Sequence, residues 1–109
     1  MSEQKQHQLG RLLAKLEQEL KYIALWDEVM PEAEALASEE PFCIDTLDLS
    51  QWLQWIFIPK MSYLLDQRMP LPNFCGIHEV AEEAFKGMDT DIEQLLSIIY
   101  EIDRVISEP

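Results

Sequence analysis

The sequence predicts an all-α protein, and three observations lead to this fold class. Apolar residues recur at steps of three and four along several stretches, which is the spacing of one helix face. Residues that cap helix N-termini precede two of these stretches. No stretch of about four to eight residues alternates apolar and polar side chains between turn signals, as a half-buried strand would. We expect a small up-and-down four-helix bundle whose second helix is interrupted by a proline.

Length and composition predict a single domain over residues 1–109. Of the 109 residues, 48% are hydrophobic and 27% are charged, as in ordinary globular domains. The longest uncharged stretch, residues 49–59, is about half as long as a bilayer-spanning helix. The polar N-terminus reaches its first aliphatic residue only at Leu9, unlike a secretory signal. We therefore expect a cytoplasmic protein without a membrane segment.

The first helix is predicted from an apolar stripe. Its members are Leu9, Leu12, Leu13, Leu16, Leu20, Ile23 and Trp26. This spacing predicts a helix of about 20 residues. The helix should end before Pro31, because proline disfavours the helical conformation of the residue that precedes it.

Two connecting segments follow the first helix. Residues 31–41 are acidic and rich in alanine, and they predict a linker with one or two helical turns that Pro41 ends. Residues 41–47 are expected to form an irregular connection. Phe42 and Ile44 should anchor this connection to the core.

The second helix is predicted to begin after Asp48. Asp48 and Gln51 have the spacing of a capping box, in which each side chain bonds the backbone N–H of the other residue. The main apolar stripe consists of Leu49, Trp52, Leu53, Ile56 and Phe57. Trp55 and Ile58 project away from that stripe, so the helix is apolar on more than one side. Pro59 cannot donate a backbone hydrogen bond, and the helix is expected to kink or break before it continues.

A long loop and a short helix are predicted next. Residues 69–76 contain two prolines and a glycine, which marks a loop, and Leu71 and Phe74 should tuck inward. A short helix over residues 77–86 should be closed by Gly87, since glycine favours the left-handed backbone that ends helices.

The last helix has the longest apolar stripe after the first. Thr90 and Glu93 have the spacing of a second capping box and should begin it. Its stripe consists of Ile92, Leu95, Leu96, Ile99, Ile102, Val105 and Ile106. The pattern therefore predicts an amphipathic helix that ends close to the C-terminus.

The charge of the chain is strongly negative, −13 in total with a pI near 4.3. This field repels phosphate backbones, so direct binding of nucleic acid is disfavoured. Residues 31–50 carry a net charge of −6 and residues 71–109 one of −7, whereas residues 51–70 carry +1. The aromatic segment 51–70 is therefore the expected partner-facing surface, and a basic protein is the partner that the overall charge favours.

The sequence contains no recognisable catalytic or metal-binding motif. Cys43 and Cys75 belong to no CxxC pair and are expected to be buried thiols. Cys75 and His78 have a ligand-like spacing, but a structural zinc needs four ligands and only His7 remains, in the polar N-terminal tail. Neither histidine follows a glutamate by three residues, as in di-iron bundles. We predict no enzyme, no metal and no cofactor.

The leading candidate site is a surface for a protein partner on the second helix. Trp55, Ile58 and Lys60 are expected to form an exposed aromatic and basic patch, the composition that protein interfaces favour. Gln54 would contact the partner or satisfy an indole. A second copy of the chain could use the same patch, and the sequence does not separate a homodimer from association with another protein.

The alternative candidate site is a pocket for a small molecule or a reaction. It would lie between the kinked second helix and the 69–76 loop. Its lining residues would be Trp52, Tyr63, Phe74 and His78. Trp52 also has the alternative of packing in the core, since it lies on the main stripe.

Three residues near these candidates are expected to have structural roles. Asp45 and Thr46 have side chains that bond nearby backbone, so they should pin the start of the second helix rather than act in catalysis. Pro59 sets the interruption of that helix.

The tryptophan-rich segment resembles a known family. The motif consists of Pro41-Phe42, Asp45-Thr46, Trp52-Leu53-Gln54-Trp55-Ile56, Ile58-Pro59-Lys60-Met61 and Leu71-Pro72. It is similar to the signature of the YqcC-like family of small bacterial proteins, and the resemblance covers most of the chain. It implies a compact helical bundle and brings no catalytic residues. Members are associated with a tRNA pseudouridine synthase, which implies an accessory role in which this acidic chain docks a basic RNA-modifying enzyme.

Overall fold

The computed structural model describes residues 3–72 and 76–107, and every regular element within these ranges is helical. The longer helices are α1 (Glu3–Tyr22), α4 (Ile58–Asp66), α5 (Ile77–Ala84) and α6 (Glu93–Ser107). The shorter ones are α2 (Ala33–Leu36), the 3₁₀ turn η1 (Pro41–Cys43), α3 (Leu49–Trp52) and the π turn η2 (Leu53–Phe57). The all-α prediction is confirmed for the described residues.

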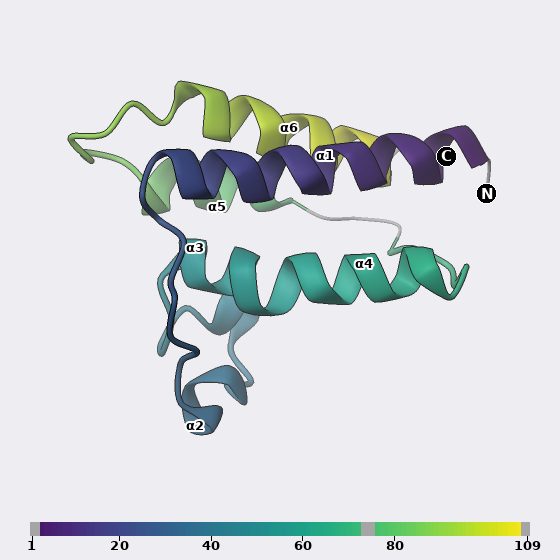
Figure 1. Cartoon of the computed structure of the whole chain (residues 1–109). Coiled ribbons are helices and arrows are strands. Elements are labelled where there is room, and N and C mark those ends of the chain that lie inside the picture. The colour runs from purple at the N-terminus through teal and green to yellow at the C-terminus, as the bar shows by residue number, and fades with distance from the viewer. Residues whose placement is uncertain (1–2, 73–75, 108–109) are drawn as a thin grey trace.

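The helices pack in two layers around a shared core (Figure 1). Helices α1 and α6 lie side by side and antiparallel, and α5 packs against α6. The continuous helical run from α3 through η2 to α4 forms the other layer and contacts α1 through α4. The short helix α2 lies away from both layers (Figure 1). No helix of the described ranges is long and apolar enough to cross a membrane.

Helix α1 has the predicted length but different bounds. It starts at Glu3, before the apolar stripe, and ends at Tyr22. Ala24 adopts a left-handed conformation (φ 62°), and the Leu25 N–H donates to the Leu20 carbonyl at 2.8 Å. This is the closing geometry that glycine usually provides at helix ends. Trp26, the last residue of the predicted stripe, therefore lies beyond the helix.

The second helix begins at the predicted capping box and continues past its proline. The capping box is confirmed, with the Asp48 N–H donating to Gln51 Oε1 at 2.9 Å. At the interruption the helix widens into the π turn η2, where the Ile58 N–H donates to the Leu53 carbonyl, five residues earlier. A wider turn accommodates Pro59, which has no N–H and crowds the preceding turn. The helix then continues to Asp66. The expected interruption is therefore a π turn and not a break.

The π turn determines which side of this helix is buried. Buried residues recur every four positions, in two series: Leu49, Leu53, Phe57 and Met61, and Ser50, Gln54 and Ile58. A regular helix of about 3.6 residues per turn would rotate such series progressively off the core. The π turn takes up the extra residue and keeps both series facing inward.

A buried glutamine ties this helix to the connection that follows α1. Gln54 is 4% exposed. Its Oε1 accepts a hydrogen bond from the Asp27 N–H at 2.8 Å, and its Nε2 donates to the Asp27 carbonyl at 2.7 Å. Gln51 Nε2 also donates to Asp27 Oδ2, at 3.1 Å. The three bonds fix the backbone at Asp27 against the second helix.

Side-chain hydrogen bonds also hold the segment before α3. Thr46 Oγ1 donates to the Ala35 carbonyl at 2.7 Å, and Ser38 Oγ donates to Asp45 Oδ1 at 2.5 Å. Asp45 and Thr46 thus bond residues 7 and 11 positions earlier in the chain, whereas they were expected to pin the start of the second helix. These two hydrogen bonds connect the segment to α2 and to the residues that follow α2.

The two expected anchors of this segment behave differently. Phe42 packs its ring edge-on against Trp52, with ring centroids 4.9 Å apart. Ile44 is 67% exposed, so its predicted anchoring is wrong. Phe42 and Cys43 both have positive φ, 58° and 51°. This turn leaves Cys43 and Leu47 as the buried positions and directs Ile44 outward.

Helices α5 and α6 are held together at the start of α5. Asp103 of α6 accepts hydrogen bonds from the Ile77 N–H at 3.0 Å and from the His78 N–H at 2.7 Å. A carboxylate at a helix start satisfies free N–H groups and complements the positive end of the helix dipole. The α5 helix ends at Ala84, two residues earlier than predicted, and Gly87 has the left-handed φ of 82° that the expected closure requires.

The start of α6 differs from the predicted capping box. Asp91 Oδ1, not the Thr90 side chain, accepts the hydrogen bond from the Glu93 N–H, at 3.0 Å. The prediction that Thr90 caps this helix is therefore wrong. The apolar stripe of α6 is confirmed, and its buried members include Leu95, Ile99 and Ile102.

We expect Gln54→Leu to lower the free energy of unfolding by about 1–3 kcal/mol, because it leaves the Asp27 N–H and carbonyl without their buried partner. Urea unfolding followed by circular dichroism measures the change. Gln67→Leu is the matched control, since Gln67 is exposed and its side chain bonds the adjacent, exposed Asp66. Equal losses in the two variants would contradict a special role for Gln54.

We expect Asp103→Asn to lower the free energy of unfolding by about 1–2 kcal/mol, because an amide offers one acceptor oxygen where two backbone N–H groups need partners. Amide hydrogen exchange at Ile77 and His78 should accelerate. Glu101→Gln removes a charge from the same helix and serves as the control. Unchanged exchange at both amides would show that Asp103 does not hold the start of α5.

Candidate functional site

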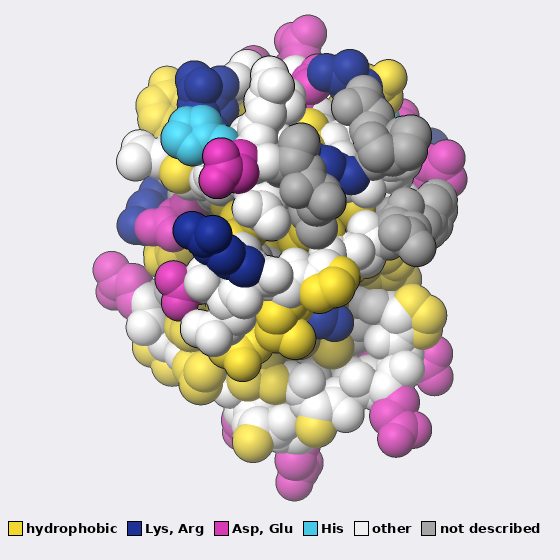
Figure 2. Space-filling view, turned by 90° about the vertical axis from the view of Figure 1, so that its right-hand side faces the viewer, with side chains coloured by type: hydrophobic (Ala, Val, Ile, Leu, Met, Phe, Trp, Pro, Cys, Tyr) yellow, Lys and Arg dark blue, Asp and Glu magenta, His cyan; other side chains and the backbone are white. Residues whose placement is uncertain are grey.

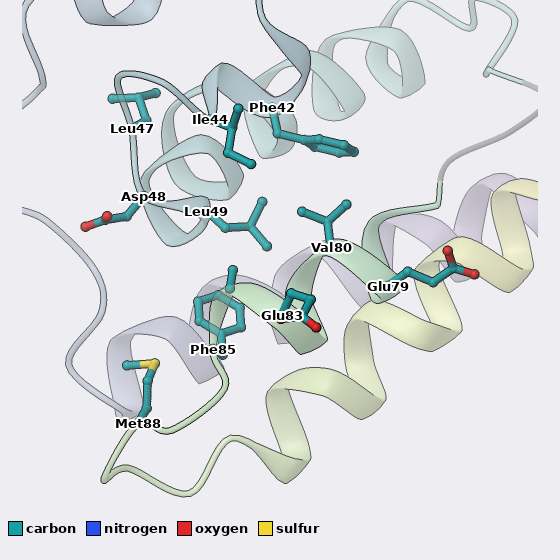
Figure 3. A pocket seen from close by; sticks show the side chains of 11 residues that line it. Phe42, Ile44, Leu47, Asp48, Leu49, Glu79, Val80, Glu83, Phe85 and Met88 are labelled. Carbon is teal, nitrogen blue, oxygen red and sulfur yellow. The ribbon is translucent and has the colours of Figure 1, made fainter.

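An apolar groove with a volume of about 780 Å³ lies between the start of the second helix and α5 (Figure 3). One wall is the segment around η1 and the start of α3, which contributes Phe42, Ile44, Leu47, Asp48 and Leu49. The other wall is α5 and the turn after it, which contribute Glu79, Val80, Glu83, Ala84, Phe85 and Met88. In Figure 3 the side chains of Phe42 and Leu49 face that of Val80 across the groove. We refer to these eleven residues as the groove.

The groove has a buried floor and exposed apolar edges. Leu47, Leu49 and Phe85 are buried, which joins the floor to the core. Ile44 on one wall is 67% exposed and Met88 on the other is 37% exposed. Large apolar side chains therefore face solvent on both sides of a continuous apolar depression, a feature typical of interaction sites.

The charges around the groove are all negative. Asp48, Glu79 and Glu83 are exposed, and no Lys, Arg or His lines the groove. Glu79 and Glu83 form no ion pair within the described residues. The two walls come from the most acidic segments of the chain, residues 31–50 and 71–109. Several carboxylates around an apolar groove of low dielectric constant produce a negative electrostatic potential in the groove.

The chemistry that the groove offers is recognition of an apolar, positively charged group. Its polar side chains are the three carboxylates of the rim, and no nucleophile stands beside a base among its lining residues. Within the described ranges no three His, Cys, Asp or Glu side chains are grouped so that they could hold a metal ion. The apolar lining and the carboxylates can support binding of such a group.

A second hollow lies beside the tryptophan motif. It has a volume of about 640 Å³, and Trp26, Glu28, Gln54 and Trp55 are among its lining residues. Trp55 is half-buried, and its indole N–H is buried without an acceptor in the described part of the chain. The Lys21 ammonium lies 5.1 Å from the ring centre of Trp26, at the far side of the same connection.

A third hollow, between α1 and α4, carries charges of both signs. Its volume is about 1080 Å³, and its basic lining residues are His7, Arg11 and Arg68. Glu3, Glu17 and Asp66 lie among them. Figure 2, which shows the molecule from the right-hand side of Figure 1, likewise has Lys and Arg side chains interspersed with Asp and Glu. Neither sign dominates this face, in contrast to the groove.

The predicted partner patch on the second helix is not formed as expected. Ile58 is 9% exposed and belongs to the core, and Gln54 is buried by its bonds to Asp27. Lys60 is exposed and Trp55 is half-buried. The prediction that Ile58 and Gln54 reach a partner is wrong, because the π turn brings both onto the inward side.

The predicted pocket is not assembled by its described residues. Trp52 lies between two rings of the core, with centroid distances of 4.9 Å to Phe42 and 5.3 Å to Phe57. Tyr63 is 59% exposed. His78 instead packs against Tyr100 of α6. Phe74 lies outside the described residues.

The His78 side chain contacts residues of α5 and α6. Its ring lies edge-on to Tyr100, with centroids 5.3 Å apart, and its Nδ1 is 3.1 Å from Glu82 Oε1. These neighbours are unrelated to those of Trp52. Of the cysteines, Cys43 is buried as expected, whereas Cys75 lies outside the described residues.

Sequence reasoning missed the groove, although one signal pointed to it. The two acidic segments contain apolar residues that fit no helical stripe, Ile44 and Met88. An apolar residue that no stripe accounts for, within a charged segment, is a candidate for an interface. The aromatic segment 51–70 was favoured by composition, but Trp52 and Phe57 pack in or against the core.

Comparison with known proteins identifies relatives over nearly the whole chain. The family model described as DUF446, tRNA pseudouridine synthase C, matches residues 8–105. An uncharacterised protein of Haemophilus influenzae is 38% identical over 99 residues, which cover 91% of this chain and 92% of the relative. The uncharacterised protein YqcC of Escherichia coli K12 is 34% identical over 93 residues, which cover 85% and 83%.

Two further matches concern structure and length. The solution NMR structure of YqcC from E. coli has a TM-score of 0.83 with this chain at 27% identity, and the match covers 95% of this chain and 89% of YqcC. A tRNA pseudouridine synthase C of Pectobacterium carotovorum is 36% identical over 83 residues, 76% of this chain but only 22% of that protein. The fold and the extent of the sequence match confirm the resemblance to YqcC, and the chain belongs to the DUF446 family.

Proposed function

We propose that this chain is a non-enzymatic accessory protein that docks onto a basic RNA-modifying enzyme, a tRNA pseudouridine synthase. The observation that carries the proposal is the match to 22% of a protein named tRNA pseudouridine synthase C. A region similar to this chain there shares one polypeptide with a much longer remainder, to which this chain has no aligned counterpart. When a domain is fused to an enzyme in one species, a similar domain in another species is a natural candidate for non-covalent association with the corresponding enzyme.

The charge of the chain supports this partner. An enzyme that binds tRNA needs a basic surface, since phosphate contacts dominate nucleic-acid affinity. A chain with a net charge of −13 attracts such a surface and is repelled by RNA itself. On this proposal the chain acts in the cytoplasm as a single four-helix domain. It binds the protein component and makes no direct contact with tRNA.

A second candidate function is the binding of an apolar cationic small molecule. The groove volume of about 780 Å³ lies in the range of small-molecule sites, and its lining is mostly apolar. Such sites usually carry a few convergent polar groups, however, and here the carboxylates stand only on the rim. A ligand at 100 times its dissociation constant would stabilise the fold by about 2.7 kcal/mol, which a thermal-shift screen would detect.

We expect the purified chain to form a complex with the tRNA pseudouridine synthase C of its own organism. Isothermal titration calorimetry should give a micromolar or tighter dissociation constant near ~0.1 M salt. The affinity should fall at ~0.5 M salt, because salt screens the attraction between exposed charges. Calorimetry with tRNA alone should show no binding at either salt concentration.

The control is an unrelated acidic protein of similar net charge, which should not bind the synthase detectably at the higher salt concentration. Absence of a complex with the synthase at both salt concentrations would contradict the proposed function. Binding of tRNA by the isolated chain would contradict it as well, since the role of the chain would then include the nucleic acid.

A further inference from the structure

We infer that the groove is the docking site for an amphipathic segment of a basic protein partner, which places aliphatic side chains between Ile44 and Met88 and Lys or Arg side chains against the rim carboxylates. The inference rests on the proposed function only for the identity of the protein that supplies the segment. The chemistry of the segment follows from the groove itself.

The apolar part of the argument is the exposure of Ile44 and Met88 on opposite walls. Both are large apolar side chains in contact with solvent, and Phe42, Leu49 and Val80 line the same groove. A segment seated between the walls would bury both exposed side chains at once, and apolar burial is the main source of association free energy. A single small group on the floor would leave the outer edges exposed.

The position of Ile44 is held by the surrounding structure. Phe42 and Cys43 adopt left-handed conformations that non-glycine residues rarely take. The Thr46 hydrogen bond to the Ala35 carbonyl braces the turn from outside, and Phe42 braces it from inside by its contact with Trp52. A wall that is fixed before binding loses little conformational entropy when a partner docks.

The charge part of the argument concerns Glu79 and Glu83. They are separated by one helical turn on α5, and like charges at this spacing destabilise a helix. Neither forms an ion pair within the described residues. Cationic side chains of a partner would relieve this repulsion and would also meet Asp48 on the opposite wall.

The same charges exclude the other natural occupants of the groove. A second copy of this chain would bring a further net charge of −13 and the same three carboxylates to the contact, so the two copies would repel each other. A nucleic acid would bring phosphates. A helix of a basic protein, anchored by aliphatic side chains three and four residues apart, fits both the apolar floor and the negative rim.

The experiment compares two groove variants with two matched controls. Ile44→Asp and the double variant Glu79→Lys/Glu83→Lys change exposed groove residues, so both should fold, which circular dichroism checks. Tyr63→Asp places a carboxylate at an exposed aromatic position outside the groove. Glu34→Lys/Glu39→Lys makes the same change in net charge as the double variant, at exposed positions outside the groove.

Two probes are used near ~0.15 M salt, where long-range attraction between exposed charges is largely screened. One is a fluorescein-labelled amphipathic helix made only of leucine and lysine, followed by anisotropy. The other is the tRNA pseudouridine synthase C. We expect each groove variant to bind both probes at least ~10-fold more weakly than the wild type, a difference of about 1.4 kcal/mol, and each control to stay within ~2-fold.

The outcomes separate this inference from the proposed function. If groove variants and controls behave alike toward both probes, the groove inference is overturned. If the synthase binds all variants equally tightly, it docks elsewhere: the groove inference fails and the proposed function stands. A third outcome is that the synthase does not bind the wild type while the leucine–lysine helix binds the wild type more tightly than the groove variants. In that case the proposed function fails, and the inference that the groove binds an amphipathic basic segment stands. A wild-type dimer that Ile44→Asp dissociates in sedimentation would replace the basic partner with a second copy and overturn the inference.

Discussion

The architecture depends on how one helix accommodates Pro59. A proline inside a helix removes a backbone donor and crowds the preceding turn. Here the helix widens into the π turn Leu53–Phe57 and continues. The wider turn keeps residues four positions apart on the same inward side, which places Gln54 in the interior. A buried amide must be paired, and Gln54 is paired by both backbone groups of Asp27. The proline thus determines where the connection after α1 attaches.

This attachment continues to the groove. Gln51 bonds Asp27 with its Nε2 and the Asp48 N–H with its Oε1, so the fixed connection and the start of α3 share one side chain. Asp48 in turn stands on the groove rim. The opposite wall, α5, is held by Asp103 from α6. Each wall is therefore positioned by hydrogen bonds between residues distant in sequence, and the groove is preorganised rather than formed by loose surface loops.

The features that were predictable from the sequence are those set by local spacing. The Asp48–Gln51 box, the stripe of α6 and the left-handed Gly87 each involve residues a few positions apart. Gln54 and Ile58 were misplaced, because a helical projection assumes a constant rotation per residue and the π turn breaks that assumption. Ile44 was misplaced because its direction depends on a positive φ at Phe42, which residue type does not signal. The groove joins residues 42–49 to residues 79–88, and no local pattern contains it.

The match to part of a longer relative bears on what the groove would contribute to an association. Where two units share a polypeptide, a short flexible linker holds them at an effective concentration on the order of millimolar, so even a weak contact is occupied. Where two such units are not covalently joined, the contact between them must supply the missing affinity. Charge attraction raises the rate of encounter but is screened by salt, whereas apolar burial persists. On the proposed function, the groove provides both contributions on one surface: Ile44 and Met88 are exposed, and Glu79 and Glu83 form no ion pair among the residues that the structure describes.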